Sequence, residues 1–118
     1  MIADSFDELP IQYLDTAVTI RIDRPIGSRH PEWNFIYPIN YGYIPGVIAP
    51  DGEELGAYLL GVFEPVQEFS GTCIAILHRL NDNDDKLIVV PKNKNYSNAQ
   101  IRALTEFQER FWQSEIIR

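Results

Sequence analysis

The residues of this chain that could take part in chemistry are concentrated in two acidic clusters. These are Asp51, Glu53 and Glu54 in the first cluster, and Asp82, Asp84 and Asp85 in the second. Hard cations such as Mg²⁺ bind oxygen ligands, commonly one or two carboxylates together with waters and substrate phosphates. If the two clusters converge in the fold, they form a metal platform. If they stay apart, they are solvated acidic turns.

Lys86 directly follows the second acidic cluster and begins a short apolar run. At that position it either balances the charge of the cluster or binds an anion. Other catalytic templates are missing from the sequence: it has no phosphate loop ending in Gly-Lys-Ser/Thr, no Gly-x-Ser-x-Gly elbow and no Cys or His pair at zinc spacing. His30 and His78 are therefore expected to be surface or packing residues, not general bases.

The composition restricts the class of partner. With 118 residues, 45% of them hydrophobic, the chain has the size of one compact domain over residues 1–118. A net charge of −7 argues against a duplex nucleic-acid surface, which needs cationic side chains to neutralise phosphates. No apolar run approaches the ~18 residues of a membrane-spanning helix, and the acidic N-terminus is unlike a secretion signal. We therefore expect a cytoplasmic protein with no nucleic-acid or membrane partner.

A series of short strands is predicted to position the acidic clusters. Residues 18–22 alternate between apolar and polar side chains, which indicates a half-buried strand. Residues 35–46 are predicted to be extended, although Pro38 and Pro45 should prevent a regular ladder there. The other expected elements are a turn over residues 49–54, strands over 57–63, 72–80 and 87–90, and an acidic hairpin loop over 81–85.

One helix is predicted, over residues 97–113. Ser97 and Gln100 have the spacing of a capping box at its start, and an apolar stripe recurs at helical spacing along it. The stripe, which we expect to pack on the core, consists of Ile101, Leu104, Phe107 and Phe111. The last residues could add a final strand. About five short strands closed by this C-terminal helix predict a fold that is mainly β with α, a small five-stranded OB-like barrel.

Two stretches of the sequence resemble a known family. FIYPINYGYIPG at residues 35–46, followed by DGEEL at residues 51–55, closely resembles the soluble, magnesium-dependent family I inorganic pyrophosphatases, which carry a YPxNYGYIP segment and then a D-G-D-P-x-D signature. DDKL at residues 84–87, followed by Val90-Pro91, resembles that family's D-x-K-L-x-x-V-P. The resemblance covers roughly residues 18–112. It implies a five-stranded barrel that hydrolyses pyrophosphate to two phosphates, with Mg²⁺ or alternatively Mn²⁺ as the metal, in a homo-oligomer.

The resemblance also implies roles for individual acidic residues. Asp51 and Asp84 match metal-binding aspartates, and Asp82 is a looser match because the loop is shorter in this chain. Glu53 matches the aspartate that takes a proton from the attacking water. Metal coordination lowers the pKa of that water, and a neighbouring carboxylate then completes its deprotonation.

Three further residues match members of the family that contact the substrate or the nucleophile. Arg29 and Lys86 match a phosphate-binding arginine and lysine, and Tyr41 matches a tyrosine that forms a hydrogen bond near the nucleophile. Transfer of a phosphoryl group to water requires neutralisation of the nonbridging oxygens, which metals and these two cations would supply.

The chain also departs from the family pattern. Gly56 stands where a metal-binding aspartate is expected, and Glu53 is one methylene longer than the expected base. The family's N-terminal glutamate and lysine are missing, with Arg21 near the expected position of the acid. Phe111 and Trp112 take the place of a substrate-binding Tyr-Lys pair. These differences predict weak activity, because catalysis tolerates only small errors in position.

Three hypotheses about function follow from the sequence. The first is a weak metal-dependent pyrophosphatase. The second is a hydrolase of another phosphoanhydride or phosphoester, because the missing substrate cations would suit a less highly charged ligand. The third is a non-catalytic, pyrophosphatase-like binding module in which the tyrosine-rich segment serves folding alone.

Overall fold

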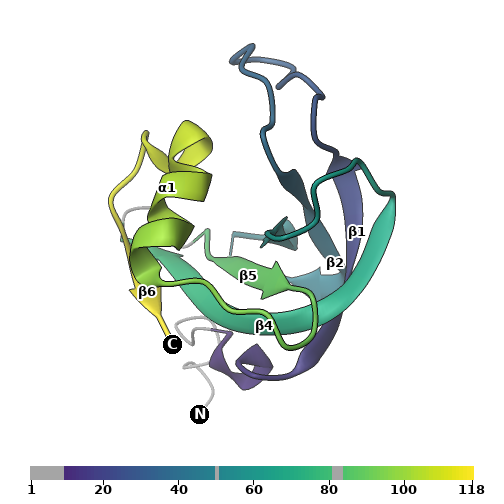
Figure 1. The fold of residues 1–118 in the computed structure, drawn as a ribbon. Coiled ribbons are helices and arrows are strands. Elements are labelled where there is room, and N and C mark those ends of the chain that lie inside the picture. Colours follow the sequence, from purple (N-terminus) through teal and green to yellow (C-terminus); the bar gives the residue numbers. More distant parts are fainter. Residues whose placement is uncertain (1–9, 50, 81–83) are drawn as a thin grey trace.

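The computed structural model describes residues 10–49, 51–80 and 84–118. These ranges contain mostly strands, together with one α-helix and one short 3₁₀ helix (Figure 1). The elements are the 3₁₀ helix η2 (Ile11–Tyr13), the strands β1 (Ala17–Arg24), β2 (Asn40–Ile48), β3 (Glu54–Leu59), β4 (Glu68–Arg79) and β5 (Lys86–Val90), the helix α1 (Asn98–Glu109) and the strand β6 (Ser114–Ile117).

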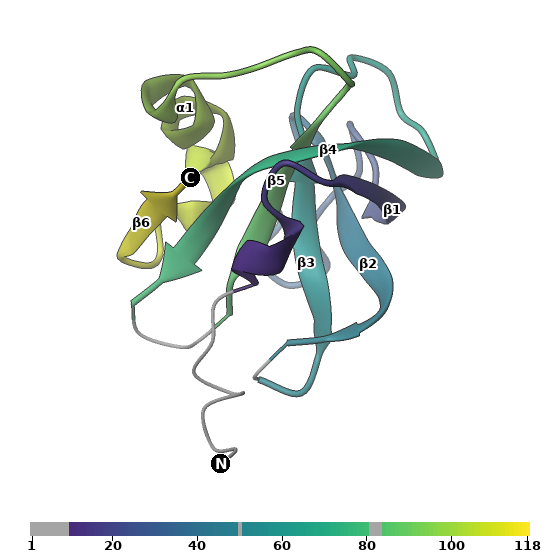
Figure 2. The same cartoon turned by 90° about the horizontal axis from the view of Figure 1, so that it is seen from below.

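Five of the strands close into a barrel. Hydrogen-bonded neighbours follow the order β1-β2-β3-β5-β4, and β4 pairs back to β1, so that no edge remains between them. β3 and β5 are parallel, whereas the other pairs are antiparallel. β6 adds to β4 outside the ring, and α1 covers the same side of the barrel (Figures 1 and 2). The predicted five-stranded barrel with a C-terminal helix is confirmed.

The prolines of the tyrosine-rich segment disturb the barrel less than expected. Asn40 to Tyr43 pair in regular register with β3, and the same part of β2 also pairs with β1. Pro45 lies within β2, at the point where the register between Tyr43 and Ile48 is irregular. A proline at such an irregularity removes no regular ladder hydrogen bond, which is why the strand continues past it. The expectation of an irregular ladder thus holds at Pro38, which lies in a bend before β2, and at Pro45, and it fails for Asn40 to Tyr43.

Two hydrophobic clusters lie on the two faces of the barrel wall. Side chains from alternate positions of β1, β3 and β5, such as Ile20, Leu55 and Leu87, fill the interior of the barrel. The intervening positions, such as Tyr58 and Ile88, form a second cluster under α1. β5 is buried along its whole length because it contributes to both clusters. This outer face of the wall, next to α1, is where the candidate site lies.

The helix begins as predicted and ends earlier. Ser97 caps α1, and the reciprocal hydrogen bonds with Gln100 form a capping box. Leu104 and Phe107 pack against the second cluster as expected. The assignment of Phe111 to the core is wrong, because the helix ends at Glu109 and the Phe111 side chain is 53% exposed. Within the described ranges, no helix is long and apolar enough to cross a membrane.

Candidate active site

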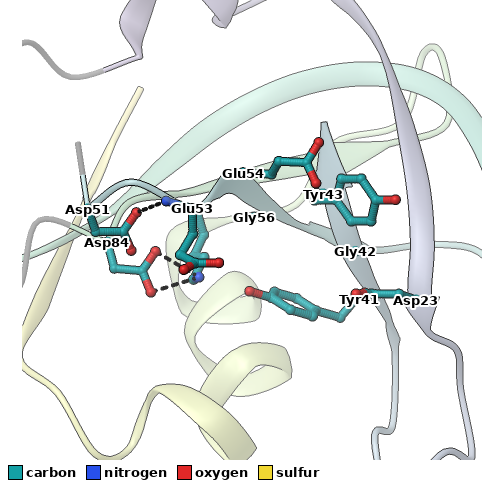
Figure 3. Close-up of a pocket in the computed structure, with 10 residues that line it drawn as sticks. Asp23, Tyr41, Gly42, Tyr43, Asp51, Glu53, Glu54, Gly56 and Asp84 are labelled. Carbon is teal, nitrogen blue, oxygen red and sulfur yellow. Dashed lines mark hydrogen bonds and ion pairs between the residues drawn. The ribbon is translucent and has the colours of Figure 1, made fainter. Parts of the chain in front are cut away.

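The register of three neighbouring strands builds the candidate site. β3 lies between β2 and β5, and Gly56 pairs with Tyr43 on one side and with Lys86 on the other. A pocket of about 470 Å³ opens beside these residues (Figure 3). Its lining consists of Asp23, Tyr41, Gly42, Tyr43, Asp51, Glu53, Glu54, Gly56, Asp84 and Lys86.

Most of the site residues predicted from the sequence line this one pocket. They are Tyr41, Asp51, Glu53, Asp84 and Lys86. The two acidic clusters therefore converge, at least through Asp51 and Asp84, which lie on the same side of the pocket in Figure 3. Asp82 lies outside the described residues. The catalytic and ligand roles of all these residues stay predictions.

Arg29 lies apart from that group. It pairs with Ile36 through an isolated β-bridge, and its guanidinium donates hydrogen bonds to the main-chain and side-chain oxygens of Asn34, at 3.1 and 3.2 Å. The side chain is exposed and does not line the 470 Å³ pocket. In this structure Arg29 stabilises the loop between β1 and β2, and its predicted contact with phosphate remains a proposal.

Lys86 and Asp84 form a buried ion pair in the wall of the pocket. Lys86 is 6% exposed, and its Nζ lies 3.0 Å from each carboxylate oxygen of Asp84. The ammonium also lies 5.4 Å from the centroid of the Tyr41 ring. Burial alone would lower the pKa of Lys86, but Tyr41 and Asp84 outweigh burial and hold the pKa above its ordinary value. Lys86 is therefore a fixed cation at neutral pH.

Arg79, which the sequence analysis did not single out, connects this ion pair to the helix. Its Nη1 lies 2.9 Å from Asp84 Oδ2, while Nε and Nη2 lie 2.9 and 2.7 Å from the two oxygens of Glu109 on α1. Burial alone would lower the pKa of Arg79, but the hydrogen bonds to Glu109 outweigh it and the pKa is raised. Asp84 is thus held between two cations. The one sequence feature that could have identified Arg79 is its position as a charged residue at the end of an apolar strand.

A chain of buried side-chain hydrogen bonds fixes Glu109 in turn. The Tyr58 hydroxyl donates to Glu109, Gln108 Nε2 donates to the Tyr58 oxygen at 2.6 Å, and the Tyr37 hydroxyl donates to Gln108 Oε1 at 2.8 Å. Burial raises the pKa of Tyr37 to about 12, so this phenol stays protonated at neutral pH. Among the described residues, no buried side-chain polar atom lacks a partner. The network therefore anchors α1 rigidly to the barrel wall.

The absence of a side chain at Gly56 makes room for Lys86. A Cβ at this position would lie 2.6 Å from the Tyr41 hydroxyl and 2.9 Å from both Cδ and Nζ of Lys86. Real Cβ atoms do not approach other heavy atoms so closely, so a larger residue would push these groups away. The Lys86 side chain thus occupies the space into which a carboxylate at position 56 would project.

The open side of the pocket is a short acidic turn between β2 and β3. The Ala49 amide donates to the Glu53 carbonyl at 2.7 Å, and Asp51 Oδ1 accepts from the Glu53 amide at 3.0 Å. Gly52 supplies the positive φ of 91° that the turn needs. Glu54 Oε2 accepts from the Gly46 amide at 3.3 Å. These local hydrogen bonds leave the Glu53 carboxylate exposed at the mouth of the pocket (Figure 3).

Asp23 supplies an acid from β1 that the sequence analysis did not assign. Arg21, near the expected position of an acid, lies outside the pocket and approaches Glu68 at 3.8 Å. Asp23 follows two residues later on the same face of β1 and lines the pocket. Burial raises the pKa of Asp23 above its ordinary value, although Arg24 opposes the shift. The alternation of β1 was the signal that could have identified it.

The donor set of the pocket suits a hard divalent cation of the kind that the resemblance implies. The possible metal ligands in its lining are Asp and Glu carboxylates, and neither Cys nor His contributes. Among the described residues, no group of three His, Cys, Asp or Glu side chains is close enough to hold a metal ion alone. This arrangement fits coordination in which one or two carboxylates share the ion with waters and substrate phosphates.

Comparisons with known proteins give independent evidence about the family of this chain. A family model described as "Inorganic pyrophosphatase" matches residues 13–116. The inorganic pyrophosphatase of Saccharolobus solfataricus is 28% identical over 99 residues, which cover 75% of this chain and 55% of that protein. The inorganic pyrophosphatase of Sulfolobus acidocaldarius is 30% identical over 87 residues, which cover 70% of this chain and 47% of that protein. The chain thus spans about half the length of these curated relatives.

Solved structures show the same fold at lower sequence identity. An inorganic pyrophosphatase from Ehrlichia chaffeensis superposes with a TM-score of 0.64 at 18% identity, covering 92% of this chain and 86% of that one. One from Helicobacter pylori gives a TM-score of 0.62 at 16% identity, with coverage of 94% and 88%. At these identities the likeness establishes the fold, while the match to the family model extends over most of the chain. The chain belongs to the inorganic pyrophosphatase family.

Proposed function

We propose that this protein hydrolyses inorganic pyrophosphate to two phosphates in a reaction that depends on a divalent metal. The observation that carries the proposal is the convergence, in one pocket, of an exposed acidic turn with a buried, permanently charged lysine. The turn provides carboxylates for a metal and for proton transfer, and the lysine provides positive charge for phosphate oxygens. Membership of the inorganic pyrophosphatase family supports the choice of substrate.

Mg²⁺ is the metal that we propose, with Mn²⁺ as the alternative. Asp51, Asp82 and Asp84 would hold it. The oxygens of Asp84 also accept hydrogen bonds from Lys86 and Arg79. When bound, such an ion neutralises phosphate charge and lowers the pKa of a bound water. Because one or two carboxylates suffice when the substrate completes the shell, the ion can arrive as its complex with pyrophosphate.

The chain's own residues would perform the remaining tasks. Lys86, fixed beside Asp84, neutralises nonbridging oxygens of the substrate. Arg29 does the same if its guanidinium gives up its hydrogen bonds to Asn34 and binds phosphate instead. The Tyr41 hydroxyl orients the attacking water, and Glu53 accepts its proton as the new phosphorus–oxygen bond forms. The bridging oxygen leaves with the electron pair of the broken bond.

The test is phosphate release from pyrophosphate, measured with and without Mg²⁺ or Mn²⁺. We expect turnover only with metal. Glu53→Gln should lower kcat by about 10²–10⁴-fold, the range that general-base catalysis contributes, without loss of fold. Glu115→Gln, which changes an exposed glutamate on β6, is the matched control and should leave the rate unchanged. Unaltered turnover in Glu53→Gln would remove Glu53 from the role of base.

A non-catalytic binding module is the competing outcome of the same measurements. A ligand that binds only the folded state raises its melting temperature once its concentration exceeds the Kd. Stabilisation by Mg²⁺ and pyrophosphate without any phosphate release would therefore support a module that binds and does not hydrolyse. We also expect a cytoplasmic homo-oligomer, as the family resemblance implies, and light scattering coupled to size exclusion would measure its mass.

A further inference from the structure

One of the two cations bonded to Asp84 lies outside the lining of the 470 Å³ pocket. Asp84 and Lys86 line that pocket, and the Lys86 ammonium lies 3.0 Å from both oxygens of Asp84 (Figure 3). Arg79 reaches Asp84 Oδ2 at 2.9 Å, but it lines an adjoining cavity of about 310 Å³ and not this one. In the proposed function Lys86 and Asp84 have tasks, whereas Arg79 has none.

Arg79 and Lys86 differ in what holds them. Arg79 Nε and Nη2 lie 2.9 and 2.7 Å from the two oxygens of Glu109, and Arg79 Cζ lies 3.7 Å from the centroid of the Trp112 ring. These contacts come from α1 and from the segment after it, so the guanidinium is held in place independently of Asp84. The Lys86 ammonium is bonded to Asp84 and lines the pocket, where a phosphate oxygen would replace that carboxylate as its partner.

An anion that binds Lys86 must also come close to Asp84. Because both oxygens of this carboxylate lie 3.0 Å from the ammonium, a phosphate oxygen at hydrogen-bond distance from Lys86 would lie next to a second negative charge. Two anions at such a distance repel each other unless a cation compensates one of them. Arg79 is placed to be that cation, since its bond to Asp84 Oδ2 does not involve Lys86.

We propose that Arg79 is a positioning residue for substrate binding, which keeps the Asp84 carboxylate fixed and compensated while Lys86 exchanges Asp84 for a phosphate oxygen. The inference rests on the proposed function and adds to it a residue that acts through Asp84. Without Arg79, the exchange would take one more cation from Asp84 as the phosphate arrives, so Asp84 would retain Lys86 and the substrate would bind weakly. The contact between Arg79 and Asp84 serves substrate and transition state alike, so its loss should raise KM and leave kcat unchanged.

The experiment is a double-mutant cycle between Arg79 and Asp84, carried out in the Glu109→Gln background with Mg²⁺ present. This background is needed because Arg79→Met alone leaves the Glu109 carboxylate buried without its cation. Glu109→Gln is also the control for loss of the helix contact, since Glu109 lines neither cavity. It should keep KM for pyrophosphate within about twofold of the value for the unaltered protein.

The readouts are KM and kcat for pyrophosphate and the Kd of methylenediphosphonate, a non-hydrolysable analogue. We expect Arg79→Met to raise KM and Kd by about tenfold, which is below the usual effect of truncating a buried charge pair because the Asp84 side chain is 22% exposed. The value of kcat should stay within about twofold. In the Asp84→Asn/Glu109→Gln background no carboxylate at position 84 competes for Lys86, so Arg79→Met should change KM and Kd by less than about twofold.

The outcomes separate this inference from the proposed function. Turnover of pyrophosphate with KM and Kd that Arg79→Met leaves unchanged overturns the inference and leaves the proposed function standing. A rise in Kd that persists in the Asp84→Asn background also overturns it, since Arg79 would then act on phosphate directly. The expected pattern in Kd without phosphate release supports the role of Arg79 and overturns the proposed hydrolysis. Absence of both binding and release overturns both.

Arg79→Lys is the second variant, for use if Arg79→Met/Glu109→Gln does not fold. It keeps a cation beside Glu109, but an ammonium lacks the planar fork that bonds to Glu109 and Asp84 at once. The Kd of methylenediphosphonate should therefore rise by about threefold. An unchanged Kd in this variant would contradict the positioning role of Arg79.

Discussion

The two sides of the 470 Å³ pocket are built in opposite ways. On the buried side, Asp84 lies between Lys86 and Arg79, and Arg79 is bonded to Glu109 on the helix. Asp84 contacts Arg79 and Lys86 across short stretches of chain, whereas Arg79 and Glu109 are 30 residues apart and meet only in the folded protein. On the open side, the acidic turn is held by hydrogen bonds between neighbours such as Asp51 and Glu53, and its carboxylates face solvent.

The difference assigns the two sides different tasks. The buried side carries fixed positive charge that is already compensated within the protein, so it needs no ligand to be stable. The open side carries several carboxylates that repel one another, and a bound cation would reduce that repulsion. In the proposed function the metal would bind on the open side, and the phosphates of the substrate would compete with Asp84 for Lys86 on the buried side. Breaking each side in turn should therefore affect stability and ligand response to different extents.

The largest effect on stability is expected from Arg79→Met. This change leaves the Glu109 carboxylate buried without its cation, and removing one partner of a buried ion pair typically costs about 3–5 kcal/mol. The free energy of unfolding, measured by urea denaturation, should fall by that amount. Arg110→Met is the matched control, because Arg110 pairs with Glu106 on the exposed surface of the same helix and should contribute below ~0.5 kcal/mol.

A double variant separates the loss of the ion pair from the cost of leaving the Glu109 carboxylate buried without a cation. In Arg79→Met/Glu109→Gln the buried charge is gone, while the glutamine oxygen can still accept the hydrogen bond from Tyr58. This double variant should recover more than half of the loss. A cost for Arg79→Met no larger than that of the surface control would mean that water reaches Glu109 and that the buried side is not preorganised.

The open side was predictable from the sequence, because its determinants are local. Asp51 and Gly52 have the residue types of a tight turn, and the turn forms where expected. The family resemblance rested on the tyrosine-rich segment and the acidic signature. The alternation of apolar and polar residues in β1 predicted which face of that strand is buried. Strand boundaries were less accurate: β3 begins at Glu54, before the expected residue 57, and β4 begins at Glu68, before the expected residue 72.

The buried side was predictable only in part: the sequence places Lys86 two residues after Asp84, beside the acidic cluster, but the partner of Arg79 is distant in the sequence. Arg79 and Glu109 are 30 residues apart, and no local pattern links them. The position of Gly56 beside Lys86 depends on the parallel pairing of β3 with β5, a register that periodicity does not specify. That Gly56 is a missing metal ligand stays a prediction, and what the sequence could not indicate is that the Lys86 side chain lies beside this position.

Substitution of Gly56 should produce the next largest effect. In Gly56→Ala the new methyl would meet the Tyr41 hydroxyl and the end of the Lys86 side chain, which can move aside, so the cost should lie near the lower end of the range for overpacking, about 1 kcal/mol. Gly56→Asp meets the same obstruction, so we expect it to lower turnover with pyrophosphate by displacing Lys86. A rise in turnover in Gly56→Asp would instead show that the space belongs to a metal ligand and that Lys86 yields it readily.

Asp51 tests the open side with a smaller effect. Asp51→Ala removes the acceptor of the Glu53 amide and should cost about 0.5–1 kcal/mol, whereas Asp51→Asn keeps an acceptor oxygen and should cost less. Both variants should lose most of the rise in melting temperature that Mg²⁺ gives the unaltered protein. If Asp51→Asn retains that rise in full, Asp51 belongs to the turn alone and is not a metal ligand.

The smallest effect is expected from Asp23, and it depends on pH. Because burial raises its pKa above the ordinary value of 3.8, the folded protein binds the proton more tightly than the unfolded chain. Stability attributable to Asp23 is therefore complete below pH 3.8 and is lost as pH rises through the raised pKa. Asp23→Asn should stabilise the protein at neutral pH by less than ~1 kcal/mol, because the carboxyl is only partly removed from water and the remaining water screens the effect. It should have no effect at pH 3. Urea denaturation at the two pH values measures the difference, and a stabilisation that persists at pH 3 would mean that loss of the charge is not its cause.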